Sequence, residues 1–202
     1  MGKIFNKSNV INGLLGLLIL VVLFVPSAKA LMIQGLMKVG LFAPDTSIDH
    51  RKTTENIQSE SLAGIQFKDA AGKVLDLGNL KGKVIFLNFW ATWCPPCLAE
   101  MPSVNKLYEQ FKSDEEVVFI LVDADSDFAK AKKYMDRKGY QMPVYAVASR
   151  IPQQLFAGSL PTTVVLDKHG RISYHEVGAA DYANKKFIDF IKKLKADSAP
   201  KN

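Results

Sequence analysis

The chain has 202 residues, of which 48% are hydrophobic and 23% are charged, with two cysteines and a formal net charge of +6. This composition excludes wholesale disorder and a disulfide-dense mini-protein, and the length fits one domain with an additional segment. The net charge does not indicate nucleic-acid binding, because residues 1–44 contain four lysines and no acid, which leaves residues 45–202 close to neutral.

The N-terminal segment, residues 1–44, is predicted to direct the chain to a membrane. Lys3 and Lys7 precede an almost wholly apolar run from Val10 to Val25. A basic flank before an apolar run is typical of membrane anchors and secretory signals. A buried core helix is disfavoured because the run is terminal and nearly uniformly apolar. The favoured prediction is an uncleaved, single-pass anchor in the bacterial inner membrane.

The alternative is a secretory signal that is cleaved after Ala30. Ala28-Lys29-Ala30 is a small-x-small site, as signal peptidases require. Apolar residues resume from Leu31 to Phe42, however, and a cleaved protein would expose them. Because this second stretch also carries Gln34 and Lys38, it is typical of an interfacial segment. Either outcome places the rest of the chain outside the cytoplasm, in the periplasm.

The rest of the chain is predicted to be a polar tether at residues 45–61, a domain at residues 62–197 and a tail at residues 198–202. Within the domain, strand and helix patterns alternate, which predicts an α/β fold. Strands are expected at residues 65–67, 74–77, 84–90, 117–122, 144–147, 163–166 and 172–177. Helices are expected from residue 95 to about 112, from 126 to 138, and around residues 187–194. The turn Asp167–Gly170 predicts a closing hairpin, so the sheet is expected to be mixed.

Both cysteines fall in Trp93-Cys94-Pro95-Pro96-Cys97, between the strand at 84–90 and the next helix. At a helix N-terminus, residues three apart face the same side, so their sulfurs can form a disulfide or separate with little backbone movement. Pro95 suits the first helical position, and the positive end of the helix dipole stabilises a thiolate at Cys94. The pattern predicts redox chemistry, with Cys94 as the nucleophile and Cys97 as the resolving thiol.

Other interpretations of the cysteine pair are weaker. A zinc site needs about four ligands, and the three histidines lie far along the chain without ligand spacing. A purely structural disulfide would close a very short loop and constrain little of the unfolded chain. The acidic run Asp123–Asp127 lacks the glycine and the closing glutamate of a calcium loop, and we interpret it as a strand end followed by a helix N-cap at Asp125 or Ser126. No metal and no cofactor are therefore expected.

The stretch from Ala63 to Phe111, and above all FWATWCPPC followed by Glu-Met-Pro, resembles the TlpA/ResA-like proteins. These are membrane-tethered, thioredoxin-fold thiol-disulfide oxidoreductases that include cytochrome c maturation reductases. The resemblance covers residues 62–195 and implies a thioredoxin fold, client proteins such as apocytochrome c, and a membrane thiol electron donor. It also implies a cis peptide bond at Leu160-Pro161, opposite the cysteines, with the Leu160 backbone free to pair with a substrate segment.

The resemblance further implies a role for Glu100, which follows Cys97 by one helical turn. A glutamate at this place lies close to the thiols and tunes their protonation. The alternative is an ordinary surface glutamate in a first helical turn. Asn88 occupies the strand position at which thioredoxins proper carry a buried acid. Its amide removes one candidate proton relay and favours Glu100 as the relay.

Two tryptophans and one proline are predicted to shape the site. Trp90 is expected in the core, and Trp93 is expected to form a partly exposed lip over the sulfurs. Pro102 falls inside the predicted helix. It should kink the helix, because its ring clashes with the carbonyl of Leu98.

Together these features predict a monomeric thiol-disulfide oxidoreductase of the cell envelope that reduces client proteins and is itself re-reduced by a membrane donor. Two alternatives remain open. One is a non-catalytic thioredoxin-like binding module with a static disulfide. The other is a thiol peroxidase, which would want an activating arginine, whereas no arginine lies between Arg51 and Arg137.

Overall fold

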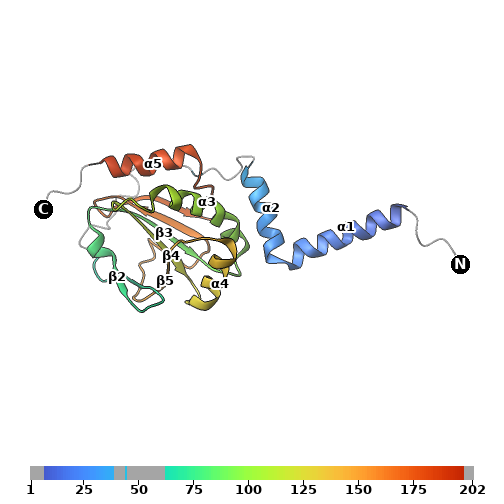
Figure 1. Ribbon diagram of the computed structural model, residues 1–202, viewed down its shortest axis with the longest axis horizontal. Helices are drawn as coiled ribbons and strands as arrows, with labels where there is room; N and C mark the ends of the chain where they lie inside the picture. The colour runs from blue at the N-terminus through green and yellow to red at the C-terminus, as the bar shows by residue number, and fades with distance from the viewer. Residues whose placement is uncertain (1–6, 39–43, 45–61, 198–202) are drawn as a thin grey trace.

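A computed structural model describes residues 7–38, Pro44 and residues 62–197. The tether predicted at residues 45–61 and the tail predicted at residues 198–202 lie outside the described residues. The described chain has a domain built on one sheet and two N-terminal helices beside it (Figure 1).

The domain is built on a seven-stranded sheet with the order β2-β1-β5-β4-β3-β6-β7. The central pairs β3–β4 and β4–β5 are parallel, whereas β6 pairs antiparallel with both β3 and β7. The sheet is therefore mixed, as the predicted hairpin required. The strands are β1 (Gln66–Lys68), β2 (Val74–Asp76), β3 (Val84–Trp90), β4 (Val117–Asp123), β5 (Val144–Val147), β6 (Thr162–Leu166) and β7 (Ile172–Val177).

The central strand β3 is buried along its whole length, as its continuous apolar sequence predicts. Because side chains alternate across a strand, Val84, Phe86 and Trp90 join one buried cluster, while Ile85, Leu87 and Phe89 join another on the opposite face. The first cluster also contains the inner faces of the helices α3 (Pro95–Phe111), α4 (Phe128–Lys138) and α5 (Lys185–Ala196). Asn88 is in phase with Phe86 and Trp90, so it points towards α3.

Element boundaries depart from the predicted ones where side chains cap the chain. The strand β2 ends at Asp76, because this residue caps the 3-10 helix η2 (Leu77–Leu80) by accepting a hydrogen bond from the Gly78 backbone. The helix α4 begins later than predicted. Its N-cap is Asp127, whose carboxylate accepts from the Lys130 backbone at 3.1 Å, so the predicted caps Asp125 and Ser126 were wrong.

The end of α4 and the position of the last helix agree with the sequence. Gly139 adopts a left-handed conformation at φ 69° and closes α4, as predicted. The helix α5 buries Phe187, Ile191 and Leu194. Figure 1 shows α3 and α5 across the same face of the sheet, and it places the C-terminal end of α5 on the opposite side of the domain from α2.

The N-terminal segment forms two helices, α1 (Lys7–Phe24) and α2 (Pro26–Lys38), with a bend of 96° between them. The bend falls at Pro26, whose ring disfavours continuation of the preceding helix. Among the described residues no single helix is long and apolar enough to cross a membrane, although the bent pair together has the required length and composition. Figure 1 shows α1 projecting away from the domain and α2 beside it.

Candidate active site

The two cysteines form a disulfide at the N-terminus of α3. Cys94 is the N-cap residue, Pro95 and Pro96 occupy the first two helical positions, and Cys97 lies in the first turn. Proline fits these positions because the first backbone N–H groups of a helix have no intrahelical acceptor. The backbone N–H of Cys97 donates to the Cys94 sulfur at 3.3 Å. The helix thus directs both a hydrogen-bond donor and the positive end of its dipole at Cys94.

The two cysteines differ slightly in their exposure. Cys94 retains 3% of its accessible surface, whereas Cys97 retains none. The disulfide therefore lies almost wholly under the surface, and the little surface that is accessible belongs to Cys94.

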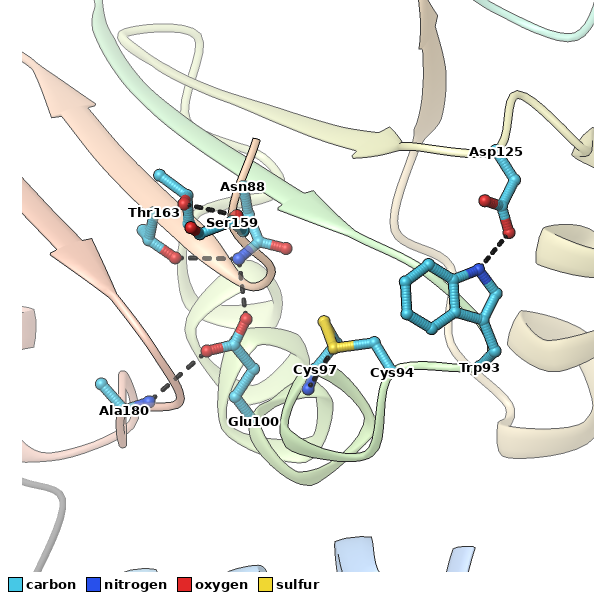
Figure 2. Close-up of a disulfide and its surroundings, with 10 residues drawn as sticks. Asn88, Trp93, Cys94, Cys97, Glu100, Asp125, Ser159, Thr163 and Ala180 are labelled. Atoms are coloured by element: carbon cyan, nitrogen blue, oxygen red, sulfur yellow. Dashed lines mark hydrogen bonds between the residues drawn. A yellow bond between two sulfur atoms is a disulfide. The ribbon is translucent and has the colours of Figure 1, made fainter. Parts of the chain in front are cut away.

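Trp93 forms the exposed rim of the site, as predicted, with 59% of its surface accessible. Its indole N–H donates to Oδ2 of Asp125 at 2.6 Å (Figure 2). Asp125 lies in the loop after β4, where the carboxylate of Asp123 accepts from the backbone N–H groups of Asp125 and Asp127. Burial raises the pKa of Asp123 above its usual range. The loop after β4 thus fixes the carboxylate that holds the tryptophan.

Glu100 is fully buried on α3, one turn after Cys97, so it is not a surface residue (Figure 2). Its Oε1 accepts from the side-chain amide of Asn88 at 2.8 Å, and its Oε2 accepts from the backbone N–H of Ala180 at 3.4 Å. Burial raises the pKa of Glu100 to about 8, although the two hydrogen bonds oppose the shift. At neutral pH the carboxyl is therefore mostly protonated.

Asn88 connects Glu100 to the neighbouring strand. The same amide nitrogen that donates to Glu100 also donates to Oγ1 of Thr163 at 2.8 Å. Asn88 and Thr163 are direct partners in the register of β3 and β6, which brings their side chains together. Asn88 thus forms a bridge between the CxxC helix and β6.

The peptide bond between Leu160 and Pro161 is cis, as the family resemblance implied. Pro161 is buried and Leu160 is half-buried. β6 begins at Thr162, which is the register partner of Phe89 near the end of β3. Because β6 runs antiparallel to β3, the segment before β6 lies at the same edge of the sheet as the cysteines that follow β3.

Comparison with known proteins decides the family. The family model described as Redoxin matches residues 38–187. The chain belongs to the redoxin family. This redoxin is 35% identical over 127 residues to "Thiol-disulfide oxidoreductase ResA" of Bacillus thuringiensis, a match that covers 62% of this chain and 72% of the relative. It is 33% identical over 135 residues to the ResA protein of Halalkalibacterium halodurans. That match covers 66% of this chain and 76% of the relative.

Solved structures show the same fold for this redoxin. A thiol:disulfide interchange protein of the thioredoxin family from Chlorobium tepidum superposes with a TM-score of 0.52 at 26% identity, over 66% of this chain and 96% of that chain. The protein is therefore a ResA-like thiol-disulfide oxidoreductase with a thioredoxin fold, as the motif FWATWCPPC indicated. The prediction of a non-catalytic module and that of a thiol peroxidase receive no support from these relatives.

Sequence reasoning about this redoxin missed Asp125, Thr163 and Ala180 as neighbours of the site. Asp125 was treated only as a possible helix cap, and Thr163 only as a strand residue. Asp125 bonds to Trp93, 32 residues away, and Thr163 bonds to Asn88, 75 residues away. Local sequence patterns do not contain such distant pairings. No group of three or more His, Cys, Asp and Glu side chains within the described residues is arranged to hold a metal ion.

Proposed function

We propose that the protein reduces disulfides in client proteins of the cell envelope through a Cys94–Cys97 pair assisted by Glu100. The observation that carries the proposal is the disulfide at the N-terminus of α3 with a fully buried carboxyl one turn after it, on Glu100. The chemistry is thiol-disulfide exchange, which requires one attacking thiolate, one resolving thiol and a route for protons.

Cys94 is the attacking sulfur of the reduced pair. Its thiolate attacks one sulfur of the client disulfide, a mixed disulfide forms, and the other client sulfur leaves as a thiolate. The N-terminal end of α3 and the N–H of Cys97 stabilise the Cys94 thiolate before attack. The small exposure of Cys94, against none for Cys97, supports this assignment.

Cys97 completes the reaction. It gives up its proton and attacks the Cys94 sulfur, which restores the Cys94–Cys97 disulfide and releases the second client sulfur as a thiolate. Two electrons pass from the pair to the client, and a membrane thiol donor returns the pair to its reduced state.

Glu100 handles the protons of these steps. With a pKa raised to about 8, it carries a proton at neutral pH that it can give to a leaving thiolate and recover from Cys97. Cys97 and Glu100 are three residues apart on one helix, so they share a face of α3. The carboxyl is held in place by Asn88 and by the Ala180 backbone.

Clients are proteins that present a disulfide on an extended segment, and apocytochrome c is the candidate that the resemblance to the TlpA/ResA-like proteins implies. Trp93 and the Leu160-Pro161 segment border the cysteines, and the Leu160 backbone is the proposed partner of the client segment. The N-terminal helices support placement at the inner membrane with the domain in the periplasm.

The test is a trap for the mixed disulfide. Cys97→Ser removes the resolving thiol, so the variant should hold its client at Cys94 as an adduct that a reductant releases and mass spectrometry identifies. Cys94→Ser is the matched control and should hold nothing. If Cys97→Ser yields no adduct under several growth conditions, or if Cys94→Ser traps equally well, the exchange mechanism fails.

A further inference from the structure

The helix α2 has two apolar faces with different surroundings. Ala30 and Met37 are buried, and Ile33 is half-buried with them, in the cluster that also contains Cys97 and Leu98 of α3. These three residues recur at a helical spacing and form the inner face of α2. The outer face consists of Leu31, Met32 and Leu36, which are 66%, 53% and 40% exposed.

A specific hydrogen bond fixes the inner face on α3. The side-chain amide of Gln34 donates to the backbone carbonyl of Leu98 at 3.3 Å. In a regular helix this carbonyl would accept from the residue four positions later, but that residue is Pro102, which has no N–H. Gln34 therefore supplies the donor that the proline removes, at a point directly after Cys97. An interior proline leaves one helix carbonyl without its usual backbone donor, so Pro102 offers Gln34 a single acceptor on α3. The bond therefore sets the position of α2 along the CxxC helix.

The outer face has the chemistry of a bilayer interface. The helix α2 follows directly on α1, whose side chains are apolar and exposed over most of its length. The two helices together have the length and composition of a membrane segment. Residues 1–44 contain no acid that anionic headgroups would repel. An apolar helix face of this kind lies about 5–10 Å deep at the headgroup boundary.

We propose that α2 is an interfacial helix that holds the CxxC helix at the surface of the bilayer, with Gln34 as its positioning residue and lipid as the partner of its outer face. The proposal deepens the proposed function and rests on it. The contact of the inner face with α3, including the Gln34 bond, fixes the CxxC helix relative to α2. With it, the cysteine pair stays at one height and orientation above the membrane that holds its electron donor.

The outer face is tested with full-length protein in phosphatidylcholine vesicles. In a Cys94→Ser, Cys97→Ser background, a fluorophore is attached through Leu31→Cys or Leu36→Cys, and through Lys132→Cys on the exposed surface of α4 as a control. Nitroxide-labelled lipid should quench the two α2 probes and leave the α4 probe unchanged. Unquenched α2 probes would overturn the proposal, and crosslinking between copies through these positions would assign the face to a second chain instead.

The inner face is tested by a double-mutant cycle read by hydrogen exchange. Gln34→Ala should speed exchange of the α2 amides about fivefold or more, whereas Met32→Ala, on the outer face, should not. In a Pro102→Ala background a backbone N–H returns to the Leu98 carbonyl, so Gln34→Ala should lose most of its effect. An equal effect in both backgrounds would overturn the role of the Gln34 bond.

One control separates this proposal from the proposed function. The variants Gln34→Ala, Met32→Ala and Pro102→Ala retain Cys94 and Cys97, so their reduction of a soluble disulfide client should match that of the unaltered chain. If the unaltered chain lacks this reaction while the α2 probes of the labelled variants are quenched, the proposed function fails and the placement of α2 stands. If the reaction is normal and the probes are not quenched, the placement of α2 fails alone.

Discussion

Asn88 and Glu100 form a polar pair inside an apolar core, and their burial shifts the pKa of Glu100. Each would cost free energy if it were buried alone, because neither side chain would keep its water hydrogen bonds. Asn88 and the Ala180 backbone donate to the carboxyl oxygens of Glu100, and Thr163 accepts from the same Asn88 amide. Burial, against the effect of these bonds, keeps Glu100 a neutral acid near pH 7. The burial that makes this arrangement costly also sets its pKa in the range where thiols titrate.

Glu100→Gln is predicted to slow thiol-disulfide exchange about a hundredfold at pH 7, because the amide cannot release a proton. The unaltered enzyme should lose rate as Glu100 ionises near pH 8, and the variant should lack that inflection. Stopped-flow rates from pH 5 to 10 measure both effects. Glu109→Gln, at an exposed glutamate on the same helix, is the control, and an unchanged inflection in Glu100→Gln would remove Glu100 from the mechanism.

Asp125 is predicted to keep Trp93 in a fixed orientation beside the disulfide. Asp125→Leu removes the acceptor of the indole N–H and should raise KM for a client about threefold, with kcat little changed. Asp125→Asn keeps an acceptor oxygen and should behave normally. Trp90 is buried, so time-resolved anisotropy of the tryptophan fluorescence should report faster motion of Trp93 in the leucine variant alone. Equal mobility in both variants would contradict the role of this bond.

At the scale of elements, the parts that sequence predicted best are those whose pattern is local. The central strand β3 was predicted with its exact ends, since its nearly continuous apolar run begins directly after Lys83 and ends a few residues before the CxxC motif. The start of α3 was predicted because two prolines fit only its first positions. The predicted N-cap of α4 was wrong. The carboxylate of Asp125 instead accepts a hydrogen bond from Trp93, and Ser126 takes a left-handed conformation at φ 56°. The burial of Glu100 and the contact of α2 with α3 depend on distant pairings, so no local pattern could give them.

Asp127→Ala is predicted to lower the free energy of unfolding by about 1 kcal/mol, the usual cost of losing an N-cap. Denaturant titration of the far-UV circular dichroism signal measures it. Asp125→Ala should cost less than about 0.5 kcal/mol, because this residue does not cap α4. A larger loss of stability in Asp125→Ala than in Asp127→Ala would instead support Asp125 as the N-cap, as the sequence predicted.

At the scale of the whole molecule, the buried carboxyl links stability to pH. The pKa of Glu100 is about 8 in the fold and 4.5 in an unfolded chain. Between these values the folded chain keeps a proton that the unfolded chain has released. The contribution of Glu100 to the free energy of unfolding therefore falls as pH rises from about 4.5 to about 8, and it is constant above that window.

The measurement is a series of denaturant titrations from pH 4 to 9 on the oxidised protein. The unaltered chain should lose stability across the window, and Glu100→Gln should be flatter there because its amide does not titrate. Using oxidised protein removes the ionisation of the cysteines from the comparison. A parallel pH dependence in the two proteins would show that Glu100 is not the group that titrates.

The opposite placement of α5 and α2 has a practical consequence for handling the protein. An affinity tag added after α5 would follow the helix end that lies across the domain from α2 (Figure 1), and α2 packs in the same cluster as the cysteines. A chain captured on a sensor surface by such a tag would present its cysteines and α2 to the flowing solution. Vesicles and folded clients could then be offered in turn to one immobilised preparation, so that lipid contact and disulfide exchange are recorded on the same molecules.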